Sequence, residues 1–583
     1  MKTMVGGEIL ANMLAREGVE VVFGIIDGTY FGLYSNLSHH GIRLITPRHE
    51  TSAVHMAGAY ARLTGKLGVC IASNGPGVAN ALPGVAVEQG EGNRVLLITS
   101  SRRTGITHPD RGGTYQQFDH VAVTRPMCKW AESARAHDRI AELAREAFRK
   151  SWAGRPGVVH LDVPEDLMNG KGPAPAFHEP GAYRRATPLA VDDDLVTRAA
   201  DLLVEGSHPL VHAGSGVLHA GASAELERVA EILRAPVTTS WAARGAIRED
   251  SELAVPMVHV ELNNTVRNAA DVVLILGSRV GETDWWGKAP YWRSPDEQKT
   301  IQVDIDDDAL GRNKPTTLAI LGDVKVFLDR LYAKLVERKS RIAVEARNAQ
   351  LANIGSLRRK AREELDKALA DGSTPMHPAH VGRTCREVLG DRAVLVFDGG
   401  NTAIWGHFYY EIRVPNTLLA THKFGMLGAG VAQALGAAVA RPDAPVCCVI
   451  GDGAMGFHPQ EIETAVRNDL RPVYLVLCDK QWGMVKLNQQ FALRPVKTLI
   501  KKSLDPDETI NADLGEIAFD KLAQSMGAHG ERVSRPGDLK PALERALSCG
   551  RCAVIHVDVD PVKHMWAPGL MYFKKMHAEP KGK

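Results

Sequence analysis

Short apolar runs alternate with helical patterns through the first third of the chain. Runs at 21–26, 68–72 and 95–99 have the length and composition of buried strands, and segments at 53–64 and 80–90 have helical patterns. Strands that alternate with helices in this way are typical of a parallel sheet with helices packed on its faces. The pattern therefore predicts an α/β domain.

The same alternation recurs twice more. In the middle of the chain and in its last third, apolar runs end in glycine or aspartate and are followed by helical patterns. We therefore predict an α/β protein with three Rossmann-like parallel-sheet domains, at 1–170, 190–340 and 372–560, and a C-terminal tail at 561–583. A length of 583 residues is sufficient for this number of domains.

The composition excludes several classes of partner. Of the 583 residues, 44% are hydrophobic and the formal net charge is only +2, so no overall field attracts nucleic acid or a membrane surface. The first residues lack the apolar core of a signal peptide, and no apolar run is long enough to span a bilayer. The eight cysteines are scattered, which favours reduced thiols over a zinc site. These features predict a cytoplasmic enzyme.

Two polar strand ends in the last third carry the most informative chemistry. The run 446–450 ends in Gly-Asp-Gly, and the run 473–477 ends in Cys478 and Asp479. Carboxyl ends of neighbouring parallel strands meet at one edge of a sheet, where ligands bind. Asp452 and Asp479 could therefore hold a divalent cation such as Mg²⁺, which would clamp a diphosphate. Taken alone, both aspartates could equally cap turns or helices.

The spacing of this stretch resembles the diphosphate motif of thiamine-diphosphate (ThDP) enzymes, in which Gly-Asp-Gly precedes an Asn-Asn pair. Here Asp479 stands at the second Asn position, 27 residues beyond Asp452 (452 to 479). The resemblance implies that Asp452, Asp479 and the backbone carbonyl of Gln481 bind Mg²⁺. The pair Cys478-Asp479 departs from the family pattern, because Asp keeps an oxygen ligand but adds a negative charge beside the diphosphate.

A second resemblance surrounds Glu50. Arg-His-Glu at 48–50, Ala-Gly-Ala-Tyr-Ala-Arg at 57–62 and Asn-Gly-Pro-Gly-Val-Ala-Asn at 74–80 are similar to the pyrimidine-binding domain of the acetolactate synthase and oxalyl-CoA decarboxylase group. A glutamate at a helix start is by itself often explained by the helix macrodipole. The resemblance implies that Glu50 hydrogen-bonds N1′ of the ThDP pyrimidine and promotes its activation. It also implies a homodimer with shared active sites, in which Glu50 serves the cofactor of the neighbouring chain, and a homotetramer.

The resemblance assigns further residues to the site. Tyr115 and Gln116 are expected over the reactive carbon of the cofactor, with amides where the family has acids. Leu427 takes the position of the apolar wedge that bends the cofactor, and Gly425 precedes it in the same element. Other expected cofactor contacts are Asn74, Pro76, Asn80, Gly399, Gly400, Asn401, Gly453, Ala454, Trp482, Gly483 and Met484. The expected substrate pocket is lined by Ile26, Met127 and Trp566.

The middle domain and the tail leave alternatives open. Glycine turns after two middle strands suit a nucleotide, so this domain could hold ADP, CoA or FAD, or serve only as structure. Arg279 could face a phosphate and Asp304 or Asp306 a ribose, or each could form surface ion pairs. The aromatic tail could pack on a neighbouring subunit, or close over the active site as a lid with Lys574 near substrate phosphates.

Within the ThDP enzymes, the chain most resembles the 2-hydroxyacyl-CoA lyases. This implies ThDP- and Mg²⁺-dependent cleavage of a 2-hydroxyacyl-CoA into formyl-CoA and an aldehyde or ketone, reversible as a condensation. The non-carboxylate pocket residues and the tail favour an acyl-CoA substrate. The alternatives are an oxalyl-CoA decarboxylase, an acetolactate-synthase-like carboligase acting on 2-keto acids, and a non-catalytic ThDP-fold subunit. Retention of Glu50 speaks against the last of these.

Overall fold

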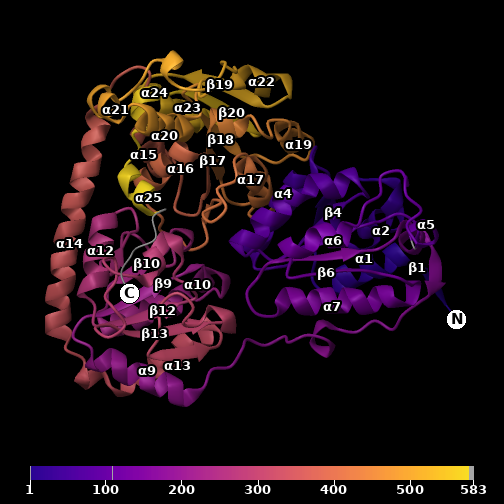
Figure 1. Ribbon diagram of the computed structural model, residues 1–583, viewed down its shortest axis with the longest axis horizontal. Helices are drawn as coiled ribbons and strands as arrows, with labels where there is room; N and C mark the ends of the chain where they lie inside the picture. The colour runs from indigo at the N-terminus through magenta and orange to yellow at the C-terminus, as the bar shows by residue number, and fades with distance from the viewer. Residues whose placement is uncertain (1, 108, 577–583) are drawn as a thin grey trace.

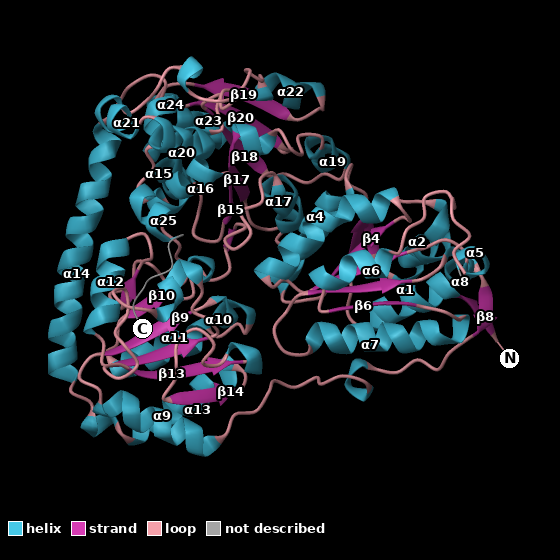
Figure 2. Ribbon diagram, in the orientation of Figure 1, coloured by secondary structure: helices cyan, strands magenta, loops and turns pink. Residues whose placement is uncertain are grey.

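The computed structural model describes residues 2–107 and 109–576. In this part of the chain, three six-stranded sheets follow one another along the sequence, each surrounded by helices (Figure 1, Figure 2). Neighbouring strands within each of these sheets are parallel. The predicted fold class, an α/β protein with three parallel-sheet domains, is therefore confirmed.

The first sheet has the strand order β3-β2-β4-β5-β7-β6. Its strands are β2 (Val21–Gly24), β3 (Arg43–Ile45), β4 (Gly68–Ala72), β5 (Val95–Thr99), β6 (Trp130–Ser133) and β7 (Val158–Asp162). The helices of this domain are α1 (Gly6–Arg16), α2 (Phe31–Leu37), α3 (Glu50–Thr64), α4 (Pro76–Glu91), α5 (Thr104–Thr107), α6 (His120–Thr124), α7 (Ile140–Trp152) and α8 (Glu165–Asn169). A short antiparallel pair joins its two ends, formed by β1 (Thr3–Val5) and β8 (Lys171–Pro173).

The central sheet has the order β11-β10-β9-β12-β13-β14. Its strands are β9 (Pro209–Ala213), β10 (Val237–Thr239), β11 (Ala254–Val255), β12 (Val272–Leu276), β13 (Lys299–Asp304) and β14 (Leu318–Leu321). Its helices are α9 (Asp193–Glu205), α10 (Ser215–His219), α11 (Ser223–Leu233), α12 (Val260–Ala269) and α13 (Val324–Glu337). The strand order reverses between β9 and β12, which is the point where doubly wound sheets bind nucleotides.

The last sheet has the order β16-β15-β17-β18-β20-β19. Its strands are β15 (Val394–Asp398), β16 (Leu418–Leu419), β17 (Val446–Gly451), β18 (Val473–Cys478), β19 (His529–Val533) and β20 (Ala553–Asp558). Its helices are α15 (Ala379–Val388), α16 (Gly400–Tyr409), α17 (Ala429–Ala440), α18 (Asp452–Met455), α19 (Glu461–Arg467), α20 (Gly483–Leu493), α21 (Pro495–Lys501), α22 (Phe519–Ser525) and α23 (Pro536–Ser548).

Three further helices lie outside the three predicted domain ranges. The long helix α14 (Val344–Asp366) runs along one side of the molecule from the central domain to the last one (Figure 1). After the last strand the chain forms α24 (Pro561–Met565) and α25 (Leu570–Met576). Helix α25 lies where the last and central domains meet, and Trp285 Nε1 of the central domain donates to Tyr572 Oη at 2.6 Å.

The packing of α3 against α17 fixes the first domain against the last one. A single hydrophobic cluster includes Met56 and Ala59 of α3 together with Val431 and Leu435 of α17. The helices approach so closely that a Cβ atom at Gly436 of α17 would lie 2.4 Å from the backbone carbonyl oxygen of Met56. Small residues are therefore required at this crossing, because the interior has no space for an added methyl group.

Several predicted boundaries shift in the structure. The strand expected at 21–26 ends at Gly24, and the helix expected at 80–90 begins at Pro76. The apolar pattern also does not predict β6, β14 or β19, because these edge strands are short and expose part of their side chains. Among the described residues, no helix combines the length and the apolar character needed to cross a bilayer.

The Gly436 contact predicts a local loss of stability on substitution. Gly436→Ala should lower the free energy of unfolding by about 1–3 kcal/mol, because the new methyl group must displace helix backbone. Gly390→Ala is the control, since no atom lies within 4 Å of a Cβ built there. Equal melting temperatures for the two variants would contradict the proposed tight helix crossing.

Candidate active site

Asp452 and Asp479 are brought together by adjacent strands of the last sheet. Gly451 of β17 pairs with Leu477 of β18, and each aspartate directly follows the end of its strand. Because the strands are parallel, both carboxylates lie at the carboxyl edge of the sheet, where ligands of open α/β sheets bind. This strand pairing agrees with the expectation from the sequence that Asp452 and Asp479 are neighbours.

Asp452 is held by backbone N–H groups. Gly453 N donates to one carboxylate oxygen at 2.8 Å and Lys480 N donates to the other at 2.8 Å. Burial raises the pKa of Asp452 to about 6, with a further contribution from the negative charge of Asp479. The site therefore contains two mutually repelling carboxylates that a divalent cation would neutralise.

The hydrogen bonds of the buried Asp479 carboxylate all end on one oxygen. Oδ2 accepts from His564 Nδ1 at 2.6 Å and from Gln481 Nε2 at 3.1 Å. Within the described part of the chain, Oδ1 has no hydrogen bond from these or other side chains, so it remains able to bind a cation. Gln481 Nε2 also donates to the carbonyl of Pro561 at 2.8 Å, which connects this loop to α24.

The donor atoms fit Mg²⁺ by type. Among the described residues, no group of three or more His, Cys, Asp or Glu side chains is placed to hold a metal ion. The ligands predicted from the sequence are only two such side chains, Asp452 and Asp479, together with the backbone carbonyl of Gln481. All three supply oxygen, and Mg²⁺ completes its shell with phosphate oxygens and water.

The side chain of Asn401, close to Asp479, has room for a ligand as its partner. Its amide nitrogen and its carbonyl oxygen are both buried, and neither has a hydrogen-bond partner among the described residues. Unpaired buried polar atoms are uncommon and indicate a missing partner. A Cβ atom at Gly483 would lie 2.8 Å from Asn401 Nδ2, and Gly399 has a φ of +90°. Glycines at these positions leave the space that a diphosphate needs.

A cavity of about 500 Å³ lies beside Asp452. All of its described lining residues belong to the last domain, including Asp452, Gly453, Phe457, Trp482 and Ile517. The Trp482 ring covers Gly453, where a Cβ atom would come within 2.7 Å of it, and the adjacent Ala454 is buried. Met484 packs against Gly400, with its Cβ 3.2 Å from the position of an added Cβ.

The predicted pyrimidine-binding residues gather in the first domain. Glu50 is the first residue of α3, and its Oε2 accepts from Asn80 Nδ2 at 3.1 Å. Asn74 Nδ2 donates to the carbonyl of Gln116 at 3.1 Å, which places the 115–116 loop on the turn that precedes Pro76. The structure therefore joins the predicted glutamate to Asn80, and joins Asn74 to the predicted loop at Gln116.

Exposed apolar side chains border this first-domain group. Tyr115 is 75% exposed and Ile26, which follows β2, is 51% exposed. Leu427 and Met127 are instead partly buried against the cluster shared by α3 and α17. Gly425 has a φ of +67°, and its N–H donates to the Thr421 carbonyl at 2.8 Å. The single chain thus leaves Tyr115 and Ile26 uncovered.

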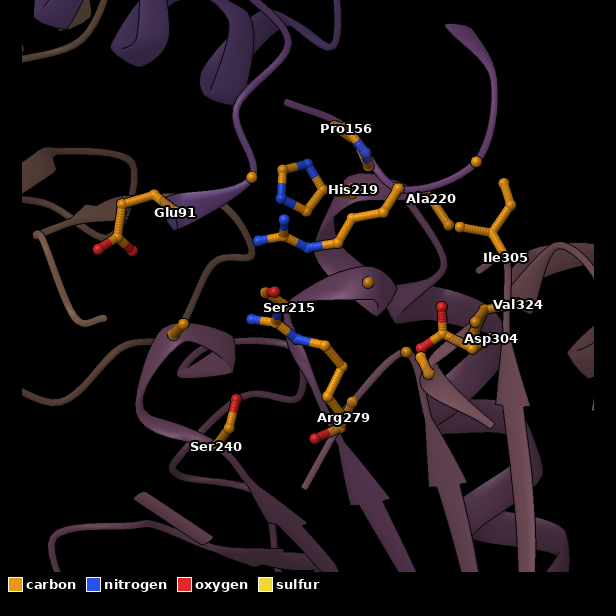
Figure 3. Close-up of a pocket in the computed structure, with 18 of the residues that line it drawn as sticks. Glu91, Pro156, Ser215, His219, Ala220, Ser240, Arg279, Asp304, Ile305 and Val324 are labelled. Atoms are coloured by element: carbon orange, nitrogen blue, oxygen red, sulfur yellow. The ribbon is translucent and has the colours of Figure 1, made fainter. Parts of the chain in front are cut away.

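A larger cleft of about 1170 Å³ lies between the carboxyl edge of the central sheet and the other two domains, which contribute residues such as Arg155 and Lys423 to its lining. Figure 3 shows Arg279 reaching toward Ser215, with Asp304 on another wall. Burial lowers the pKa of His219, and nearby arginines of the first domain, Arg94 and Arg155 among them, lower it further. Burial raises the pKa of Asp304 to about 6. Such a cleft suits an anionic, nucleotide-sized ligand.

Asp306 and Trp566 do not lie where the predicted ligand contacts require. Asp306 is not among the residues that line the central cleft; its carboxylate accepts from Asp308 N at 3.3 Å. Trp566 Nε1 donates to the Lys502 carbonyl at 2.6 Å and its ring lies against Phe491, so it anchors the α20–α21 segment. The side chain of Lys574 and residues 577–583 lie outside the described part of the structure.

The sequence did not single out His564. This residue lies in a tail that is noticeable for its aromatic side chains, and a lone histidine there carries no motif. Its contact with Asp479 appears only once α24 folds against the end of β18. The only signal in the sequence was Asp479 itself: it stands where the family has Asn, and its added negative charge calls for a hydrogen-bond donor nearby.

Three family matches cover the three domains. Residues 4–123 match "Thiamine pyrophosphate enzyme, N-terminal TPP binding domain". Residues 196–331 match "Thiamine pyrophosphate enzyme, central domain", and residues 398–557 match "Thiamine pyrophosphate enzyme, C-terminal TPP binding domain". Both of the regions discussed above, around Glu50 and around Asp452, therefore lie in segments similar to cofactor-binding domains.

The chain is also similar along almost its whole length to curated proteins. It is 29% identical to the "Probable acetolactate synthase large subunit" of Methanocaldococcus jannaschii, covering 96% of this chain and 93% of the relative. It is 27% identical to the "Acetolactate synthase isozyme 3 large subunit" of Escherichia coli, covering 97% and 96%. It is 29% identical to an acetolactate synthase large subunit of Mycobacterium tuberculosis, covering 96% of each chain.

The raised pKa of Asp452 predicts a pH-dependent difference in stability. Its value of about 6 in the folded protein lies above the ordinary 3.8, so the cofactor-free protein loses stability as pH rises from about 4 through 6. Asp452→Asn removes this ionisation. From pH 8 to pH 5, wild type should gain about 1–2 kcal/mol relative to the variant, measured by denaturant unfolding.

The same variant tests the cation site. Mg²⁺ with ThDP should raise the melting temperature of wild type at pH 8 and leave that of Asp452→Asn unchanged, because the variant lacks one anionic ligand. Asp443→Asn, at an exposed position of the same domain, is the control and should behave as wild type. For the pH prediction, a difference in unfolding free energy between wild type and Asp452→Asn that stays constant from pH 8 to pH 5 would contradict the raised pKa of Asp452.

Proposed function

We propose that this chain, which belongs to the thiamine pyrophosphate enzyme family, is a carboligase that acts on 2-keto acids. The observation that carries the proposal is similarity to acetolactate synthase large subunits over 96–97% of the chain, with the residues of both cofactor-binding regions present. When bound, ThDP supplies a nucleophilic carbon that adds to a substrate carbonyl. The chain supplies the binding, the orientation and the proton transfer.

The residues of the last domain would position the diphosphate end of the cofactor. Asp452, Asp479 and the carbonyl of Gln481 would hold Mg²⁺, and Asn401 would donate to a phosphate oxygen. Leu427 would support the bent cofactor. The role of these residues is electrostatic and geometric, since a fixed cation and fixed donors keep the reactive end in one place.

Glu50 would hold a proton at N1′ of the pyrimidine. Its burial and its hydrogen bond from Asn80 keep the carboxyl group in one orientation. Asn74 fixes the neighbouring loop, so Tyr115 and Gln116 would face the substrate from above. Neither Tyr115 nor Gln116 carries a carboxyl group, which favours hydrogen bonding to a carbonyl or hydroxyl over proton transfer.

We propose that each site is completed by a second copy of the chain. The cavity beside Asp452 is lined, among the described residues, by the last domain alone, while Glu50 bonds to Asn80 within the first domain. Apolar side chains are uncovered beside each group: Tyr115 in the first domain, and Phe457 and Ile517 on the wall of the cavity, which are 47% and 49% exposed. Association of two chains in a homodimer would cover both surfaces.

Cleavage of a 2-hydroxyacyl-CoA is the second candidate function. It is favoured by the central cleft, whose size and lining arginines, among them Arg155 and Arg279, suit the phosphates of an acyl-CoA or of ADP. It is also favoured by α25, which the Trp285–Tyr572 hydrogen bond holds between the central and last domains, as a lid segment would be. Both candidates use the same cofactor residues and differ in the substrate.

A substrate comparison separates the two candidates. Purified protein with Mg²⁺ and ThDP should convert pyruvate to acetolactate, and Glu50→Gln should reduce this rate by about 100-fold or more, because proton transfer typically contributes that much. The same protein is incubated with 2-hydroxyisobutyryl-CoA, mandelyl-CoA and oxalyl-CoA. Formation of formyl-CoA without turnover of pyruvate would refute the carboligase and support the lyase.

The Glu50→Gln control distinguishes a chemical defect from an unfolded protein. The variant should keep the wild-type oligomeric mass, and ThDP should still bind with Mg²⁺, because the diphosphate contacts are unchanged. An unchanged rate in this variant would contradict the role of Glu50 for either substrate.

A further inference from the structure

Asp479 adds a negative charge where a phosphate is expected, and the structure contains a partner for it. His564 of α24 is 3% exposed, and its Nδ1 donates to Asp479 Oδ2 at 2.6 Å. A carboxylate can only accept, so the geometry also fixes which ring nitrogen carries the donated hydrogen. The histidine is thus directed at Asp479 and not at solvent.

The other side of the same ring reaches a second element of the site. His564 Nε2 lies 3.1 Å from the hydroxyl of Thr402, which is adjacent to the unpaired Asn401 in the first turn of α16. Trp405 of α16 donates from Nε1 to the His564 carbonyl at 2.9 Å. One buried residue of the C-terminal segment therefore bridges the end of β18 and the start of α16.

The hydrogen bonds to Asp479 decide which of its oxygens is left available to a cation. Both bonds to the Asp479 carboxylate end on Oδ2, which directs Oδ1 away from the histidine. Groups that orient a metal-binding carboxylate in this way usually change metal affinity by about 10-fold to 100-fold when they are removed. Gln481 contributes from the same side, since it connects Asp479 to the start of α24.

We propose that His564 is a positioning residue for Asp479, so that α24 belongs to the cofactor site. This inference rests on the proposed function, in that Mg²⁺ and ThDP are the ligands concerned. It explains how the chain accommodates Asp at position 479: the histidine holds the added charge on Oδ2 and presents Oδ1. It also means that the segment beyond β20 acts on the cofactor site independently of any lid.

The test is a double-mutant cycle on Mg²⁺ affinity at saturating ThDP, measured by isothermal titration calorimetry. His564→Leu should weaken Mg²⁺ binding by about 10-fold or more. His564→Gln, whose amide can still donate, should recover part of the loss. In the Asp479→Asn background, which removes the charge, His564→Leu should weaken binding by only about 2-fold, because the two residues act as a unit.

Lys563→Met is the matched control on the same helix. Lys563 forms an ion pair with Asp371 at 2.7 Å and has no bond to Asp479, so its loss should lower the melting temperature without changing Mg²⁺ affinity. Two results would overturn the role of His564 while leaving the proposed function intact. One is an equal loss of Mg²⁺ affinity on His564→Leu in the wild-type and Asp479→Asn backgrounds. The other is wild-type Mg²⁺ affinity in the His564→Leu variant. If His564→Leu does not fold, His564→Phe replaces it in the cycle, because a phenyl ring fills the space of the imidazole without a hydrogen-bond donor.

Failure of the proposed function would look different. Wild type that binds no Mg²⁺ in the presence of ThDP would refute the cofactor site and, with it, the role of His564. Wild type that binds both ligands but turns over none of the tested substrates would leave the cycle valid.

Discussion

The close placement of two carboxylates at a partly buried sheet edge is the constraint on which the rest of the site depends. Parallel pairing of β17 with β18 puts Asp452 and Asp479 at neighbouring strand ends, and the repulsion contributes to a raised pKa at Asp452. Backbone N–H groups hold Asp452, whereas the histidine and the glutamine hold Asp479. Around this pair the chain leaves an unpaired Asn401 and several glycines, an arrangement that is understandable if a cation and a diphosphate complete it.

The three domains have separate tasks around that edge. The last domain holds the carboxylates, the first presents Glu50, and the α3–α17 packing fixes the two against each other within one chain. A cleft at the strand reversal of the central sheet is lined by residues of all three domains, with arginines from the first domain and the central one. The C-terminal segment contacts two of the three, because His564 reaches Asp479 and Tyr572 reaches Trp285.

Patterns of neighbouring residues predicted those elements whose formation depends on neighbouring residues. Buried parallel strands are continuous apolar runs, so β4, β5, β17 and β18 were predictable, as were the strand-end aspartates. Short edge strands such as β19 lack that signal. The His564–Asp479 contact spans 85 positions and depends on where α24 docks, which no local pattern encodes. The prediction of an acyl-CoA lyase rested on pocket residues and the tail, whereas whole-chain similarity favours the carboligase.

In the proposed homodimer, each active site joins Glu50 of one chain to Asp452 of another. The most direct measurement is complementation between two inactive variants, Glu50→Gln and Asp452→Ala, co-expressed with different tags and purified through both. A mixed dimer would contain one intact site and one doubly altered site, so a random mixture should recover about a quarter of wild-type activity, and the doubly purified fraction about half. Mixed dimers with no more activity than either variant alone would contradict the shared site.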